Sequence, residues 1–459
     1  MTGIPLLITF FFAIVLMITA ISKFNIHPFL SLIGTSLLLA IVVGLSLEQI
    51  PGIIGAGFSG TFASIGIVII LGALIGLILE KTGGALRLAD VVIRCVGEKH
   101  PQLAIMLMGW IVSIPVFCDS GFVILNPIRK ALRKKIKTSA VGMAVALSAG
   151  LYTSHVFIPP TPGPIAAAGS LGIADNLAGV ILIGAITSIP ALLAAYLFVL
   201  YISKHVQSSE DLEDDSQDTK TYEELVAEYG EIPGAAASLA PIVVPILLMG
   251  VGSVVAMTGA KGVVPSLLNF LGTPIIALAV GVLFAIGVLV STKHMDEFYS
   301  ITDETLKTVG PILFITAAGG VLGKVITAAG FVEFIKANAA FISSIGIFFP
   351  FLISAILKTA QGSSTVAITT TAGIMGMYSD SASMMTALGL TSPTAALLTV
   401  MAIGAGAMTV SHANDSYFWV VTNFSGMTPQ DGYRTHTIMT FIVGVVSILA
   451  IFTASLVLL

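Results

Sequence analysis

Long runs of apolar residues dominate this chain of 459 residues and constrain its fold more than any motif does. A helix needs about 20 mostly apolar residues to cross the hydrocarbon core of a bilayer. Charged residues make up only 10% of the chain, whereas soluble domains carry about 25%. The sequence therefore predicts an all-α polytopic membrane protein with ten full crossings, near residues 5–22, 28–46, 64–80, 139–173, 177–203, 237–258, 272–291, 309–328, 394–427 and 436–458.

Basic residues indicate a re-entrant hairpin in the first half. Short cytoplasmic loops are enriched in Lys and Arg, and two basic clusters, at 81–99 and 129–137, enclose residues 102–128. This apolar segment is too short for two crossings, so we expect it to enter and leave on the cytoplasmic side, with its tip at 118–121. Irregular backbone at membrane depth is tolerated only where it is buried in protein or lines a cavity. The tip is therefore a candidate site.

The charge distribution also orients the chain. The first apolar stretch lacks a basic n-region and a small-residue cleavage site, so we expect a retained helix and not a signal peptide. If Lys23 lies on the cytoplasmic side of the membrane, we expect both termini in the periplasm. Residues 204–232 contain ten acids and two lysines, although the whole chain has a formal charge of only −4. We expect this acidic segment to be a solvated cytoplasmic linker, and the basic run 129–137 to serve as a topology signal.

Polar motifs recur in the two halves in the same order. L-E-K-T-G-G-A at 79–85 corresponds to L-G-K-V-I-T-A-A-G at 322–330, and a Ser-His pair follows at 154–155 and at 411–412. Five crossings in the first half require a second copy to be inserted upside down. Such inverted repeats are typical of secondary transporters that bind substrate near the bilayer midplane. The predicted domains are a first inverted repeat (1–203), a linker (204–235) and a second inverted repeat (236–459).

Four polar breaks interrupt the apolar segments, at 118–121, 153–164, 361–365 and 411–416. A helix that starts after a break presents unpaired N–H groups and the positive end of its dipole, which together favour an anion. No arginine lies in these breaks, and the nearest lysine is Lys358. The predicted substrate-binding residues are Ser120, Gly121, Ser154, His155, Thr161, Gly163, Ser363, Ser364, Thr365, His412, Asn414 and Ser416.

Four ionisable side chains lie in the breaks, and an ionisable residue within a membrane marks a proton or ion pathway by default. Our hypothesis is that Asp119 or Asp415 carries a coupling proton, with His155 and His412 as relays or substrate ligands. The structural alternatives stay open: the two histidines could satisfy carbonyls of broken helices, and the two aspartates could cap the helices that follow them.

The breaks carry a resemblance to a known family. Their sequences look like the signatures of the gluconate permease family of proton symporters, in the ion transporter superfamily: F-C-D-S-G-F-V (117–123), I-P-P-T-P-G-P (158–164), Q-G-S-S-T-V-A (361–367) and S-H-A-N-D-S-Y-F-W (411–419). The resemblance implies proton-coupled uptake of a sugar acid such as gluconate across a bacterial inner membrane; relatives take up other hydroxy acids or D-serine. It also implies a homodimer, with a scaffold domain and a transport domain that moves as an elevator.

Three positions depart from the family's usual pattern. Cys118 stands where an aromatic residue is common, Thr161 replaces the histidine of P-P-H-P-G-P, and Ser364 replaces the alanine of G-S-A-T-V-A. We expect a pocket that has lost an imidazole and gained hydroxyls to contact its substrate differently.

Sodium-coupled transport, an intramembrane hydrolase and a channel are the alternatives to a proton-coupled transporter. Sodium coupling is the main rival, since carbonyls and hydroxyls near the two aspartates could ligate Na⁺. An intramembrane hydrolase would not need its polar set in both halves, and a channel would carry a repeated carbonyl filter. The chain contains no ATP-binding motif. We therefore expect no enzyme activity, cofactor, metal or nucleic-acid partner, and name substrate, proton and membrane lipid as partners.

Overall fold

The computed structural model describes residues 4–24, 26–88, 91, 100–212, 232–258, 261–330, 346–412 and 415–459. Throughout these ranges the regular structure is helical, with no strand. The first half contains α1 (Ile4–Ser22), α2 (Pro28–Val42), α3 (Ile50–Lys81), α5 (Pro101–Val112), α6 (Cys118–Ile136), α7 (Ala140–Phe157), α8 (Pro162–Ser170), η1 (Ala174–Asn176) and α9 (Leu177–Ile202).

The short α10 (Ser209–Leu212) lies in the predicted linker, and the helices of the second half follow it. These helices are α12 (Ala235–Thr258), α13 (Val263–Gly272), α14 (Pro274–Ser291), η2 (Met295–Glu297), α15 (Phe298–Ala328), α18 (Phe348–Gln361), α19 (Ser364–Met375), α20 (Met384–Ala387), α21 (Pro393–Met408), α22 (Ser416–Phe424), α23 (Pro429–Gly432), the π-helical turn η3 (Tyr433–Thr437) and α24 (Ile438–Leu458).

A helix or a pair of helices occupies each of the ten predicted crossings. α3 begins at Ile50 and α15 at Phe298, both earlier than predicted. The prediction started late because polar and glycine-rich residues precede the most apolar part of each helix. Within the described ranges, six helical stretches are long and apolar enough to cross a membrane by themselves: Ala140–Ser170, Ala174–Ile202, Ala235–Gly252, Pro274–Ser291, Met295–Ala328 and Pro429–Leu458. The chain is an all-helical, multi-pass membrane protein.

Two helical hairpins contain the first and third polar breaks. α5 and α6 pack on each other across the turn at residues 113–117, which makes the predicted hairpin of the first half a helix–turn–helix unit. α18 and α19 form the second hairpin, where Gly362 has φ +86°, a left-handed conformation that favours glycine after a helix. Each hairpin therefore ends one helix and starts another at its tip.

The second and fourth breaks interrupt longer helical segments. α7 continues through Phe157, so Thr153, Ser154 and His155 are helical, and the irregular backbone is confined to residues 158–161. All 18 residues of α7 are buried. α21 ends at Met408, and α22 starts at Ser416 on the far side of the fourth break. The broken helices form the centre of the protein.

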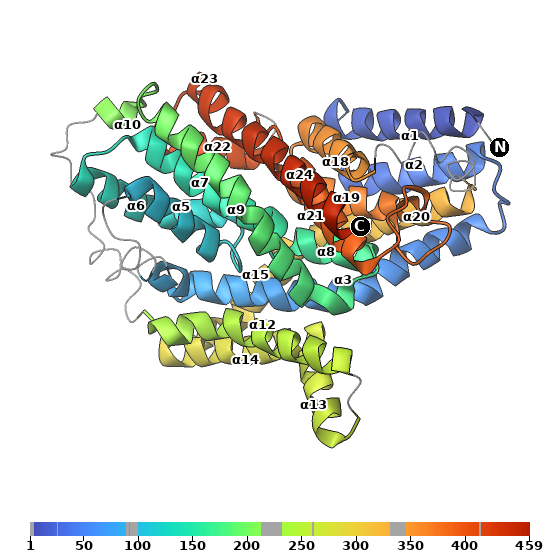
Figure 1. Ribbon diagram of the computed structural model, residues 1–459, viewed down its shortest axis with the longest axis horizontal. Coiled ribbons are helices and arrows are strands. Elements are labelled where there is room, and N and C mark those ends of the chain that lie inside the picture. The colour runs from blue at the N-terminus through green and yellow to red at the C-terminus, as the bar shows by residue number, and fades with distance from the viewer. Residues whose placement is uncertain are drawn as a thin grey trace.

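The long helices α3 and α15 pack against each other and against the broken helices and hairpins (Figure 1). α12 and α14 lie side by side along one edge, and α13 projects beyond them. Some of the contacts with the centre leave no room for a Cβ atom. A Cβ at Gly76 would overlap the carbonyl oxygen of Pro115, and one at Gly323 would overlap that of Gly373. Backbone therefore meets backbone on both long helices.

The basic run and the start of the acidic segment differ from the prediction. The run is helical as far as Ile136. Arg129 is fully buried, and its guanidinium donates to both carboxylate oxygens of Glu210 at 3.1 and 2.6 Å. Arg133 lies 3.8 Å from Asp211. The predicted topology signal thus also binds the predicted linker, because a buried guanidinium requires a partner; residues 213–231 lie outside the described ranges.

Candidate functional site

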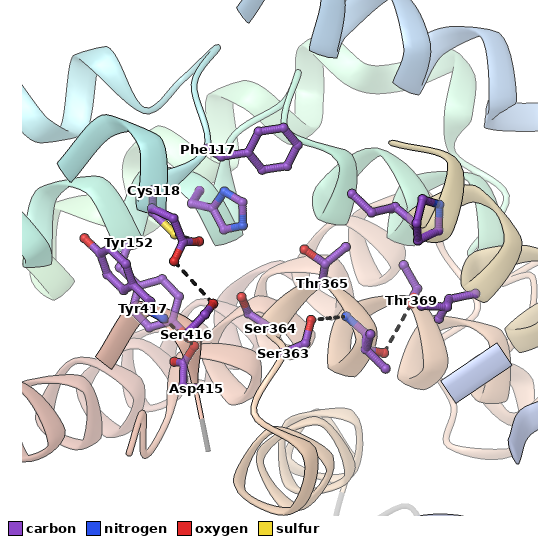
Figure 2. Close-up of a pocket in the computed structure, with 16 residues that line it drawn as sticks. Phe117, Cys118, Tyr152, Ser363, Ser364, Thr365, Thr369, Asp415, Ser416 and Tyr417 are labelled. Atoms are coloured by element: carbon purple, nitrogen blue, oxygen red, sulfur yellow. Dashed lines mark hydrogen bonds between the residues drawn. The ribbon is translucent and has the colours of Figure 1, made fainter. Parts of the chain in front are cut away.

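A cavity of about 300 Å³ lies where the two hairpin tips, α7, α15 and the fourth break meet (Figure 2). This volume is at the lower end of the range for small-molecule sites, roughly 300–1,000 Å³. The first turns of three helices line it: Cys118 and Asp119 of α6, Ser364 and Thr365 of α19, and Ser416 of α22. Three positive helix ends therefore face one cavity.

The third break forms the N-terminus of α19. Ser363 is the N-cap, and its Oγ accepts a hydrogen bond from the backbone N–H of Val366 at 3.3 Å. Ser364 and Thr365 follow in the first turn and line the cavity. The local sequence places hydroxyl groups beside the unpaired N–H groups of a helix end. This combination suits a carboxylate that also carries hydroxyl groups.

Asp119 lies in the first turn of α6, at the edge of the cavity. The hydroxyl of Ser416 donates to its Oδ1 at 3.3 Å, and the thiol of Cys118 lies 3.8 Å from its Oδ2. Within the described ranges, no Lys, Arg or His side chain forms an ion pair with this carboxylate. Asp119 thus contacts only groups that carry no full positive charge.

Asp415 has very different surroundings. The ammonium of Lys358, in the last turn of α18, donates to its Oδ2 at 2.5 Å and also to the carbonyl oxygen of Gly362. The side chain of Lys358 is 0% exposed and that of Asp415 is 6% exposed. The same carboxylate caps α22 by accepting from the N–H of Tyr417 at 3.0 Å. The capping alternative is therefore realised at Asp415, and the carboxylate is also neutralised by a buried lysine.

A hydrogen-bonded chain continues from Asp415 into the protein. The hydroxyl of Ser411 donates to Asp415 Oδ2 at 2.5 Å and lies 3.0 Å from Nε2 of His436. Nδ1 of His436 lies 3.0 Å from the hydroxyl of Ser148. His436 is fully buried and belongs to the π-helical turn η3. Single π-helical turns occur frequently at functional sites.

Aromatic side chains close one side of the cavity. The rings of Tyr152 and Tyr417 lie 5.2 Å apart, and their hydroxyls donate to the carbonyl oxygens of Ala407 and Ser148. His155 is 5% exposed, its ring lies 5.9 Å from the Phe117 ring, and its Nδ1 has no hydrogen-bond partner among the described residues. A buried polar atom without a partner at a cavity wall is available to a ligand.

Half of the predicted residues are brought together. The cavity is lined by Asp119, His155, Ser363, Ser364, Thr365, Asp415 and Ser416. The lining does not include Gly121, Ser154, Thr161, Gly163 or His412. Thr161 instead donates to the carbonyl oxygen of Ile158 at 2.7 Å, and His412 lies 2.9 Å from that of Thr359. The side chain of Ser120 and the whole of Asn414 lie outside the described part of the protein.

Sequence reasoning missed several groups at the site. The sequence marks Lys358 only as the lysine nearest to the breaks, and its position one turn before Gly362 is the signal that could identify it. Tyr417 lies inside the quoted motif at 411–419, and Tyr152 lies directly before the break at 153–164. α15 contributes Pro311, Ile312 and Ile315, which carry no polar signal. No cluster of three or more His, Cys, Asp or Glu side chains in the described ranges is arranged to hold a metal ion.

Comparison with known proteins gives the same class of protein. The model of the GntP family permeases matches residues 4–457. The chain is 32% identical to the inner membrane permease YgbN of Escherichia coli, over 97% of each chain. It is 29% identical to a gluconate permease of Pseudomonas aeruginosa, over 96% of each.

A solved structure resembles the fold as a whole. The YdaH transporter of Alcanivorax borkumensis superposes with a TM-score of 0.63 at 16% identity, covering 93% of this chain and 97% of that one. At this identity the likeness concerns the fold alone. The family model matches nearly the whole chain, and the hairpins and broken helices surround one cavity. Both observations agree on the family and on the class of protein. This protein is a member of the GntP permease family and a transporter, not an enzyme.

Proposed function

We propose that the protein takes up a small sugar acid, such as gluconate or a related aldonate, together with a proton. The observation that carries this proposal is the convergence of three helix N-termini on a cavity that also contains Asp119, a carboxylate with no ion-pair partner in the described ranges. The helix ends and the hydroxyls of Ser364 and Thr365 would hold the substrate carboxylate and its hydroxyl groups. The similarity to a gluconate permease supports the choice of substrate class.

The different surroundings of the two aspartates support proton coupling. Lys358 already neutralises Asp415, so this carboxylate adds little repulsion toward an anionic substrate. Asp119 has no such partner in the described ranges, and its charge would repel a substrate carboxylate in the same cavity. Binding of the anion therefore favours the protonated form of Asp119, and a protonated Asp119 favours binding of the anion. This reciprocity couples the two fluxes.

The charges in the cavity also predict the electrical character of transport. The empty site with ionised Asp119 carries one negative charge beyond the neutral Lys358–Asp415 pair. The loaded site, with protonated Asp119 and a monoanionic substrate, carries the same charge. A carrier that crosses with equal charge in both directions moves no net charge in a cycle. We therefore propose electroneutral symport of one proton with one monoanion.

We also propose that the hairpins and broken helices form a transport domain that moves against a scaffold containing α3 and α15. The close contacts at Gly76 and Gly323 support this division, because backbone packs directly on backbone at both positions. The same proposal includes an inverted orientation of the two halves and periplasmic termini. It also includes a homodimer in the bacterial inner membrane that contacts lipid. Alternating access would then expose the cavity to each side in turn.

Uptake into proteoliposomes tests the proposal. Purified protein is reconstituted and supplied with labelled gluconate, glycerate, threonate or D-serine, under a proton gradient or a sodium gradient imposed separately. We expect an acidic exterior to drive accumulation of at least one aldonate and a sodium gradient to drive none. The exposed Asp303, which pairs with Lys307 on the surface of α15, provides the control variant Asp303→Asn. Accumulation driven by sodium alone, or binding of no compound in the panel, would overturn the proposal.

A further inference from the structure

The buried ammonium of Lys358 lies in surroundings that suit a free metal cation. It is held by the carbonyl oxygen of Gly362, just after the C-terminal end of α18, and by the carboxylate of Asp415 in the fourth break. The hydroxyl of Ser411 lies 2.5 Å from the same carboxylate oxygen. The Lys358 side chain is 0% exposed, and its Nζ lies 5.6 Å from the centre of the Tyr152 ring.

These ligands are the ones that broken-helix transporters use for alkali cations. Unwound carbonyls and the negative C-terminal ends of half-helices coordinate coupling ions at the midplane of such proteins. Carboxylate, carbonyl and hydroxyl oxygens are also the ligands of a hard cation. An ammonium carries the same single charge as Na⁺ and donates three hydrogen bonds to such oxygens. Lys358 therefore fills, with a covalently attached cation, a position that would otherwise suit sodium.

We propose that Lys358 is a built-in cation that replaces a coupling sodium ion, and that its presence makes the transporter independent of sodium. A tethered ammonium cannot leave on either side of the membrane, so the charge of Asp415 is compensated throughout the cycle. The exchangeable cation is then the proton on Asp119. This inference rests on the proposed function for its consequence, but the cation site itself can be tested without any substrate.

The test uses sodium alone as the probe. Thermal unfolding of the purified protein in detergent is followed in sodium chloride and in choline chloride at equal ionic strength. Lys358→Ala removes the ammonium and leaves the oxygens of Gly362 and Asp415 facing the vacated space, with the Ser411 hydroxyl still bonded to Asp415. We expect sodium to raise the Tm of Lys358→Ala in a saturable way and to leave the wild-type Tm unchanged. Lys358→Arg, which keeps a cation, should show no response to sodium.

The double variant Lys358→Ala/Asp415→Asn distinguishes this site from a general salt effect, because it removes the charged ligand. We expect it to lose the sodium response. In uptake assays on Lys358→Ala, sodium should raise substrate affinity by about tenfold, within the roughly 5–150-fold range of couplings between two ligands. The wild type should differ by less than about twofold between the two salts.

Two results would overturn the inference. One is a folded Lys358→Ala variant whose Tm does not respond to sodium. The other is a wild-type protein whose own stability or uptake requires sodium, which can be measured even if the variant fails to fold. The first result leaves the proposed function untouched, because it concerns only the Tm of a variant. Failure of the proposed function would appear instead as an absence of proton-driven uptake in the wild type, even if Lys358→Ala gained a sodium-dependent Tm.

Discussion

The buried Lys358–Asp415 pair offers a direct test of how charge is balanced at the cavity. We consider Asp415→Asn, because asparagine caps a helix about as well as aspartate does. The change keeps the capping position beside Tyr417 and removes only the charge. It leaves the Lys358 ammonium, which is 0% exposed, without its counter-ion. Breaking a buried pair from one side costs about 3–5 kcal/mol.

The double variant Lys358→Met/Asp415→Asn removes both charges and should regain most of that loss. A buried pair replaced by neutral groups of similar volume is often as stable as the original. We therefore expect the double variant to lie within about 1 kcal/mol of the wild type, which corresponds to a coupling energy of at least about 2 kcal/mol between the two sites. Unfolding in detergent, followed by denaturant titration, gives the four stabilities of the cycle.

The pair Lys81–Glu304 provides a matched control. Its charged atoms lie 2.9 Å apart, but its side chains are 37% and 50% exposed. A double-mutant cycle on this exposed pair should give about 0.2–1 kcal/mol. If the Lys358 and Asp415 substitutions were additive within about 0.5 kcal/mol, the two charges would not stabilise each other, and the neutral pair assumed in the charge balance would be wrong.

Three further predictions concern other parts of the site. Asp119→Asn should abolish pH-driven accumulation, which for one proton is about tenfold per unit of pH gradient. Exchange of labelled for unlabelled substrate across the membrane should continue in this variant. Loss of both activities would indicate misfolding instead. Gly323→Ala places a Cβ against the carbonyl oxygen of Gly373 and should cost about 1–3 kcal/mol in unfolding experiments, whereas Gly310→Ala on the same helix, where no atom lies within 4 Å, should be neutral. His436→Ala leaves two buried hydroxyls without their histidine partner and should lower stability by about 1–3 kcal/mol, with partial rescue by His436→Gln in the same thermal assay.

The helices and the hairpins were predictable because they depend on local patterns. Apolar runs of about 20 residues and polar breaks are visible along the sequence, and the tip at Asp119 was placed from the spacing of two basic clusters. The serines around α19 were found because they follow a break directly. In each case the signal lies in the same stretch of the chain as the feature that it identifies, and no contact with a distant segment is needed.

The remaining features depend on contacts between distant segments. Lys358 and Asp415 are separated by 57 positions, and no local pattern shows that the second hairpin folds against the fourth break. His436 belongs to no motif, and its role appears only when Ser148 and Ser411 are brought to either side of it. Thr161 lies in a motif but bonds to its own turn. Motif membership therefore identified the right region without identifying which side chains reach the cavity.

Counting protons against substrate in one preparation tests the central claim most directly. Proteoliposomes that contain a pH-sensitive dye are given a labelled monoanionic aldonate, and both fluxes are recorded with and without a membrane potential set by potassium and valinomycin. We expect about one proton to enter with each substrate molecule, and the final ratio of internal to external substrate to be the same at every potential. Substrate uptake without proton entry, or a final ratio that changes steeply with an inside-negative or inside-positive potential, would contradict electroneutral symport.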